Sequence, residues 1–152
     1  SDRDWSSDVC SSDLRPPMAF SNYMEGLVSD WLTGSAMPAA PAGLYVGLFT
    51  SDPTDAGGGG EVTTTVRAAG RAAATFGAGA DDGAGGTKKT NTVAVDFGQS
   101  AGDVAGTVTH FGIFDAGAAG NLLLHGALDA AKPVTTGDPV VFPIGSLSFT
   151  VR

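Results

Sequence analysis

The sequence predicts an all-β fold: an antiparallel β-sandwich or jelly-roll-like domain with one amphipathic helix near its N-terminus. About seven or eight short apolar stretches alternate with turn signals built from Gly, Pro and Asp, as in β-sandwiches. One stretch alone shows a helical apolar period. The chain has 23 glycines, but they do not recur at every third position, which excludes a collagen-like fibre.

The N-terminal residues do not look like part of the natural protein. Residues Asp4 to Leu14 read as the translation of a common sequencing-adapter oligonucleotide joined to an environmental reading frame. We therefore expect residues 1–17 to be a non-native, disordered segment, and residues 18–152 to form a single domain that starts naturally at Met18. The one cysteine, Cys10, lies in that segment, so the domain has neither a disulfide nor a thiolate site.

Charge and hydropathy narrow the classes of partner. The formal net charge is -8, whereas a nucleic-acid surface needs clustered Lys and Arg for the phosphates. No stretch approaches the run of about 20 apolar residues that spans a bilayer, and no export signal follows Met18. We expect no nucleic-acid partner and no membrane span.

The helix is predicted at about residues 21–33. Its apolar residues recur at steps of three and four: Phe20, Met24, Leu27, Val28, Trp31 and Leu32. Ser21 can cap the first turn, and Gly34 can end the last. We expect the apolar face to pack on the helix's own domain and to bury Trp31. The alternative is that it docks on a neighbouring subunit.

The strongest strand lies within residues 43–55 and ends in the turn Ser51-Asp52-Pro53. Both of its faces are apolar, which is typical of a central strand. One face carries Leu44, Val46 and Leu48. The other face carries Tyr45 and Phe49.

Weaker strands are predicted along the middle and the end of the chain. The threonine-rich stretch Glu61–Val66 suggests an edge strand, and Val93 and Val95 of Thr92–Phe97 are expected to face the same way. Gly77–Asn91 is predicted to be a long polar loop. The remaining strand candidates are Arg71–Phe76, Lys132–Thr136, Val140–Phe142 and Leu147–Val151.

Residues 107–115 and 121–129 predict a β-hairpin. A register with Phe114 opposite Asn121 gathers four apolar side chains on one face, namely Phe111, Ile113, Leu122 and Leu124. This register also places His110 opposite His125.

The opposed histidines are the sharpest candidate for a metal site, since their Cβ atoms would lie roughly 5 Å apart. His110 and His125 would still need a third ligand, such as Asp115 or Asp129, and local hydrogen bonding is the commoner role of such a pair. The acidic turns Asp52/Asp55 and Asp81/Asp82 lack the ligand spacing of an EF-hand, so we interpret them as turn-formers. We therefore expect no metal and no cofactor.

Catalytic motifs are also missing. The sequence has no Gly-x-Ser-x-Gly elbow and no phosphate-binding loop. Its two glutamates, Glu25 and Glu61, lie on the helix and at a loop edge. These observations predict a protein that is not an enzyme.

Three segments, LYVGLFTSDPTD, GTVTHFGIFD and NLLLHGALD, resemble a family of small bacteriophage tail-fibre-like proteins, and the resemblance extends from Met18 to Arg152. It implies a non-enzymatic structural component of the virion, assembled in the host cytoplasm and associated with the tail. Homo-oligomers and contacts with other virion proteins would follow. Members carry a Tyr-x-Arg triplet, where this chain has Ala69-Gly70-Arg71, so Arg71 matches and the tyrosine does not.

Two alternatives share the same fold. A module that binds host-surface glycans would show exposed Trp or Tyr beside polar side chains, and a head-decoration protein would differ only in its partner. For the assembly role, Tyr45, Phe114 and Leu123 are candidates for interface residues, as apolar surface left over once one sheet face is packed.

Overall fold

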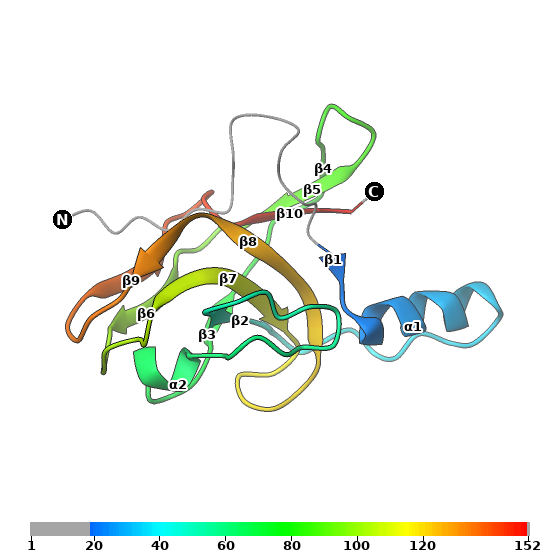
Figure 1. Cartoon of the computed structure of the whole chain (residues 1–152). Helices are drawn as coiled ribbons and strands as arrows, with labels where there is room; N and C mark the ends of the chain where they lie inside the picture. Colours follow the sequence, from blue (N-terminus) through cyan, green and yellow to red (C-terminus); the bar gives the residue numbers. More distant parts are fainter. Residues whose placement is uncertain (1–18, 152) are drawn as a thin grey trace.

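The computed structural model describes residues 19–151, and the adapter-like segment lies outside them. The regular structure of the described chain is mostly antiparallel strands, with one long helix near its N-terminus (Figure 1), which confirms the predicted class. The elements are β1 (Ala19–Phe20), α1 (Asn22–Leu32), β2 (Leu44–Phe49), α2 (Thr63–Val66), β3 (Ala72–Ala74), β4 (Ala80–Asp81), β5 (Thr87–Thr90), β6 (Val95–Gln99), β7 (Thr107–Phe114), β8 (Leu122–Pro133), β9 (Pro139–Phe142) and β10 (Ser148–Val151).

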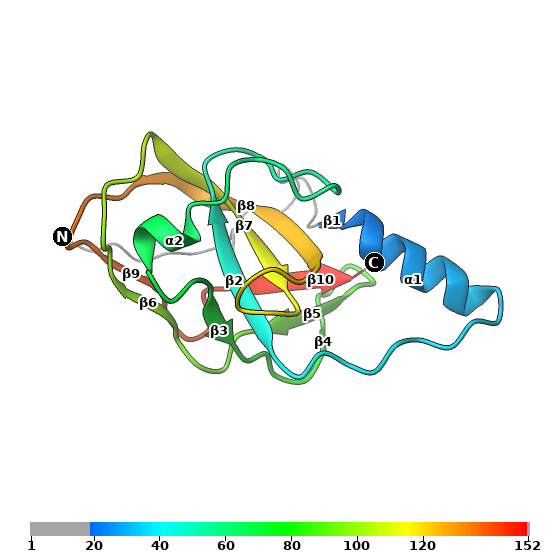
Figure 2. The same cartoon turned by 90° about the horizontal axis from the view of Figure 1, so that it is seen from below.

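The strands form three sheets. The largest has the order β1-β8-β7-β2-β3, and the two smaller sheets have the orders β10-β5-β4 and β6-β9. Side chains from all three sheets meet in one buried cluster, so the core lies between the large sheet and the two small ones (Figures 1 and 2). Representative members are Val46, Phe111, Val95, Phe142 and, packed against the cluster, Phe149.

Strand β2 has a neighbour on each side, β7 and β3, as its two apolar faces predict. Val46 and Leu48 enter the main core. Phe49 points to the opposite face, where it forms a second small cluster with Phe114 and Leu122. The predicted division of this strand into two faces is confirmed.

A pair of glycines creates the space for that second cluster. Gly47 of β2 lies opposite Gly112 of β7. A Cβ atom on Gly112 would come within 2.7 Å of Leu122 Cδ1 and 3.0 Å of the Phe49 ring. The aromatic rings therefore settle into the groove that the two missing side chains leave on the sheet.

The predicted hairpin is present, but its predicted register is wrong. Phe114 lies opposite Leu122 instead of Asn121, and Ile113 lies opposite Leu124. The extra residue, Leu123, forms a β-bulge that reverses the facing of the strand. Leu123 and Leu124 therefore both enter the main core, while Leu122 turns to the Phe49 cluster.

Three other local predictions are also wrong. Glu61 makes one bridge to Phe49, after which the chain turns into α2, because the Thr63 hydroxyl accepts the Leu48 N–H at 3.4 Å in place of a strand carbonyl. Residues 77–91 contain β4 and β5, which join β10 in a sheet. Val93 is 56% exposed whereas Val95 is fully buried, so β6 starts only at Val95.

The acidic turn between β4 and β5 behaves as a turn-former. Asp82 Oδ1 accepts the N–H groups of Ala84 and Gly86 at 2.8 Å each. Asp81 Oδ1 likewise accepts the N–H of Gly83, which has a φ of +78°. The carboxylates thus replace strand partners inside the turn, and this explains how a glycine-rich stretch holds two strands.

The glycine groove yields a test of packing. Gly112→Ala should lower the free energy of unfolding by about 1–3 kcal/mol, because the added methyl group overpacks the Phe49 cluster. Gly26→Ala in α1 is the matched control, since its Cβ would meet nothing within 4 Å and alanine favours the helix by about 1 kcal/mol. Urea unfolding followed by circular dichroism measures both. Equal stability of the two variants would contradict the packing account.

Candidate functional site

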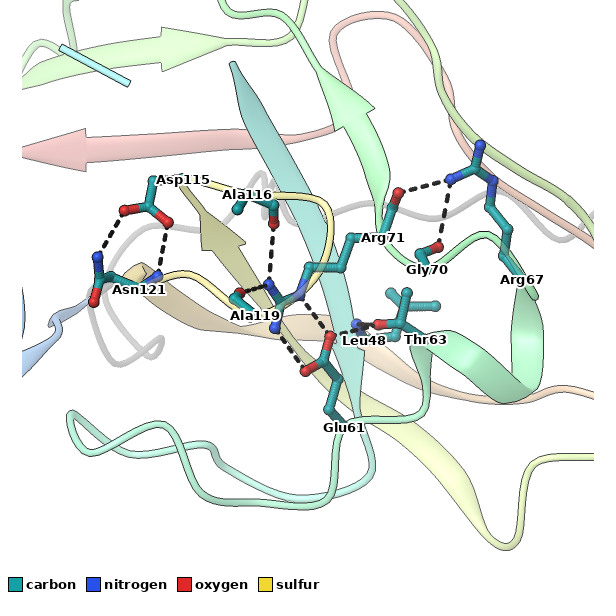
Figure 3. Close-up of polar contacts among 10 residues, drawn as sticks. All are labelled: Leu48, Glu61, Thr63, Arg67, Gly70, Arg71, Asp115, Ala116, Ala119 and Asn121. Atoms are coloured by element: carbon teal, nitrogen blue, oxygen red, sulfur yellow. Dashed lines mark hydrogen bonds and ion pairs between the residues drawn. The ribbon is translucent and has the colours of Figure 1, made fainter. Parts of the chain in front are cut away.

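Arg71 is the centre of a polar cluster that joins several loops (Figure 3). It directly precedes β3 and is 8% exposed. Its Nε lies 2.7 Å from Glu61 Oε1, and its Nη2 lies 2.9 Å from Glu61 Oε2, a two-point ion pair. Its guanidinium carbon also lies 3.3 Å from the centre of the Phe114 ring.

The same guanidinium fixes the loop between β7 and β8. Arg71 Nη1 donates to the carbonyl oxygens of Ala116 and Ala119 at 3.0 and 2.5 Å. Ala119 has a φ of +53°, a conformation that is unfavourable for alanine. Asp115 closes the loop by accepting both the backbone and the side-chain N–H groups of Asn121.

Glu61 is the anion of this cluster, and its neighbours fix its position and its charge. It lies above Gly47, where a Cβ atom would come within 2.8 Å of Glu61 Oε1. Burial acts to raise the pKa of Glu61, but hydrogen bonds from Arg71 and Thr63 outweigh it and hold the pKa below its ordinary value of 4.5. The carboxylate is therefore ionised and fully engaged, which makes it a structural counter-ion and a poor general base.

A second polar site is a cavity of about 310 Å³. Its lining includes Asp52, Thr54, Asp55, His110 and His125. His125 Nε2 lies 3.0 Å from Asp55 Oδ1, and its Nδ1 lies 3.4 Å from Asp52 Oδ1. His125 thus holds the turn after β2 against β8.

The predicted pairing of the two histidines is wrong. His110 lies opposite Ala127 and His125 lies opposite Gly112, because the hairpin starts with Phe114 opposite Leu122 and shifts by one more residue at Leu123. Both still line the same cavity as diagonal neighbours. Within residues 19–151, no three His, Cys, Asp or Glu side chains are grouped to hold a metal ion.

His110 is partly buried beside this cavity. Burial lowers its pKa below the ordinary 6.5, the charge of Asp52 acts in the opposite direction, and the nearby His125 lowers the pKa further. Its Nδ1 lies 2.8 Å from the hydroxyl of Thr109. His110 is therefore held by a local hydrogen bond, the commoner of the two roles considered for it.

Helix α1 projects from the body of the molecule (Figures 1 and 2) and carries exposed apolar residues. Ser21 caps it, accepting the Met24 N–H at 3.3 Å and donating to the Leu122 carbonyl. Only the first half of the helix then lies against the sheet. Trp31 and Leu32, in the last turn, are 56% and 71% exposed, so the prediction that Trp31 is buried is wrong.

A groove of about 460 Å³ runs beside the helix. One wall is the helix with the returning linker at residues 37–41, and the other is formed by residues of the large sheet and of β10. Its lining comprises Phe20, Tyr23, Met24, Leu27, Met37, Pro38, Ala39, Ala40, Pro41, Leu44, Ile113, Asp115, Leu123, Leu124, Phe149 and Val151. Asp115 is the one charged residue among these.

Two of the three residues expected at an interface are buried in the structure. Phe114 and Leu123 are 5% and 8% exposed, so the premise that they remain as surface is wrong. Phe114 is covered by Arg71, and Leu123 enters the core through the bulge. Tyr45 is half-buried. The exposed apolar residues around α1 are Tyr23, Trp31, Leu32 and Met37. For Trp31 and Leu32, the sequence signal is an apolar helical stripe longer than the sheet can cover.

Comparison with known protein families gives a match over most of the described chain. A protein family described as "Podophage GP4 fiber I protein gp80" (Gp80) matches residues 19–150. No curated protein sequence matches the chain. Within the described residues, no helix has the length and apolar character needed to cross a membrane.

The Arg71 cluster predicts a large loss of stability when one partner is removed. Arg71→Ala should lower the free energy of unfolding by about 3 kcal/mol, because it leaves Glu61 without its cation. Arg71→Lys should recover part of this loss, since an ammonium keeps the charge and loses the fork geometry. Arg67→Ala is the control: Arg67 bonds only the carbonyls of Gly70 and Arg71 in this cluster, and should cost about 1 kcal/mol.

Urea titrations at pH 7 and at pH 3 measure these effects. Because the folded-state pKa of Glu61 is lowered, its stabilising effect is complete above its unfolded pKa and is lost as the pH falls through the folded value. Glu61→Gln should therefore lose less stability than the unmodified chain between pH 5 and pH 3. If Glu61→Gln loses as much stability as the unmodified chain between pH 5 and pH 3, the role of Glu61 is contradicted.

The lowered pKa of His110 predicts that stability also depends on pH in a higher pH range. The unfolded chain takes up a proton at about pH 6.5 that the folded chain takes up only at lower pH, so stability should fall as the pH drops below about 6.5. His110→Gln should flatten this slope and leave the stability at pH 8 nearly unchanged. Thermal unfolding from pH 8 to pH 5 tests it, and a slope that survives the substitution would refute the assignment.

Proposed function

The chain belongs to the family of the podophage GP4 fiber I protein gp80, and from this premise we propose that it is a tail-associated structural component of a bacteriophage virion. In this proposal the chain acts through protein–protein assembly and catalyses no reaction. It is made and assembled in the host cytoplasm, and it forms homo-oligomers or contacts other virion proteins.

One observation supports assembly most directly: the apolar stripe of α1 continues past the body of the molecule. Trp31 and Leu32 are exposed in the last turn, and Met37 follows at the start of the linker. Single exposed apolar residues are ordinary, but a contiguous group on a projecting element is typical of an interface. Met37 also lines the groove beside the helix, together with the earlier helix residues Tyr23, Met24 and Leu27.

The polar clusters support a structural role over catalysis. Glu61 and Arg71 neutralise each other, and Arg71 Nη1 bonds backbone carbonyls. His125 is held between Asp52 and Asp55. These groups stabilise the loops of the domain, whereas a catalytic acid or base needs a free proton or lone pair directed at a substrate.

Host-glycan binding is a second candidate, favoured by the exposure of Trp31. Sugar-binding sites place an aromatic face beside polar groups, and Trp31 follows Asp30 and Ser29 in the sequence of α1. The nearest aromatic residue of the helix, Tyr23, is 39% exposed. The apolar groove next to the helix suits a protein partner better than a sugar, and we therefore place assembly first.

Immunogold labelling of virions that carry this gene tests the proposal. We expect the label at the tail, and the protein should be found by mass spectrometry of purified particles. A label confined to the head would replace the tail assignment with a decoration role. If the protein is missing from the particles, the structural proposal fails.

A further inference from the structure

We infer that the projecting end of α1 and the groove beside it bind a segment of another virion protein that presents apolar side chains flanked by Lys or Arg. This inference rests on the proposed function and adds the chemistry of the partner. It also states which occupant is disfavoured, namely a second copy of this chain.

The apolar side chains expected in the partner are inferred from the groove. Its volume of about 460 Å³ lies within the range of about 300–1,000 Å³ that is usual for ligand pockets. The side chains that line it come from the helix, the linker, the large sheet and β10, and nearly all are apolar. A partner that fills it gains free energy by removing this surface from water.

The basic residues expected in the partner are inferred from the two flanks of the apolar stripe of α1. Glu25 lies seven residues before Leu32, and Asp30 lies seven residues after Tyr23. Residues seven apart fall on nearly the same side of a helix, so each edge of the apolar stripe carries one carboxylate. Both carboxylates are exposed, and the helix contains no basic residue.

The C-terminal end of α1 adds to the negative potential of these carboxylates. The last turn of a helix carries a partial negative charge, which basic side chains normally offset. The last turn of α1 has none, and Asp115 is the charged residue of the groove lining. A cationic side chain beside the helix therefore meets favourable potential from its last turn and from the carboxylate on that edge of the stripe, Glu25 or Asp30.

A second copy does not provide this complement. The chain has a net charge of -8, and two copies that met through this surface would bring identical acidic rims together. The basic pair Lys88 and Lys89 on β5 does not line the groove, and the Lys89 ammonium donates to the Gly77 carbonyl at 3.2 Å. Rim contacts are shorter than the screening length of about 8 Å at physiological salt, so the repulsion would persist.

Two synthetic amphipathic peptides test the inference on the full chain. They share one leucine stripe and differ only at its flanks, which are lysine in one peptide and glutamate in the other. Fluorescence anisotropy should show at least tenfold tighter binding of the lysine peptide, with an affinity that falls between 50 and 300 mM salt. Equal affinities, or no binding of the lysine peptide up to 1 mM, would overturn the inference.

Variants separate the two halves of the surface. Glu25→Gln with Asp30→Asn should bring the two affinities together, whereas Trp31→Ser with Leu32→Ser should abolish binding of both peptides. Circular dichroism confirms that each variant is folded. Light scattering provides the remaining outcome: a dimer of the unmodified chain that the Trp31/Leu32 variant dissociates would assign the surface to a second copy. That result would overturn this inference and leave the proposed assembly function intact.

Discussion

The ion pair between Arg71 and Glu61 is the interaction on which the outer face of the large sheet depends. Burying two charges costs several kcal/mol, and the cost is recovered only when geometry and additional hydrogen bonds are good. Here the fork of Arg71 meets both carboxylate oxygens and two loop carbonyls, and its plane covers Phe114. One side chain thus joins the loop after β2, the start of β3 and the β7–β8 turn.

Gly47 and Gly112 make that arrangement possible. Larger residues at these facing positions would occupy the space of the Glu61 carboxylate and of the Phe49 and Leu122 side chains. The large sheet therefore has two different faces. One packs on the other sheets through aliphatic and aromatic residues, and the other is covered by its own loops, which the Arg71 cluster and the His125 contacts hold in place.

The sequence pattern was sufficient for what depends on local periodicity and was insufficient for what depends on register. The alternation in β2 and the helical period of α1 predicted those elements correctly. The bulge at Leu123 could not be predicted, because any of the three consecutive leucines 122–124 can be buried, and a bulge changes which of them face the core. The role of Arg71 was equally hidden, since its partners come from residues ten and more than forty positions away.

Helix α1 is stabilised at its ends more than along its length. An isolated helix of its eleven residues would be marginal in water, but Ser21 anchors the first turn to β8, and Thr33 and Gly34 close the last. Full burial of a leucine is worth about 1.5–3 kcal/mol, and the single chain does not obtain this from Leu32. Because the helix is already formed and capped, a partner that covers its end gains that burial without the entropic cost of folding it.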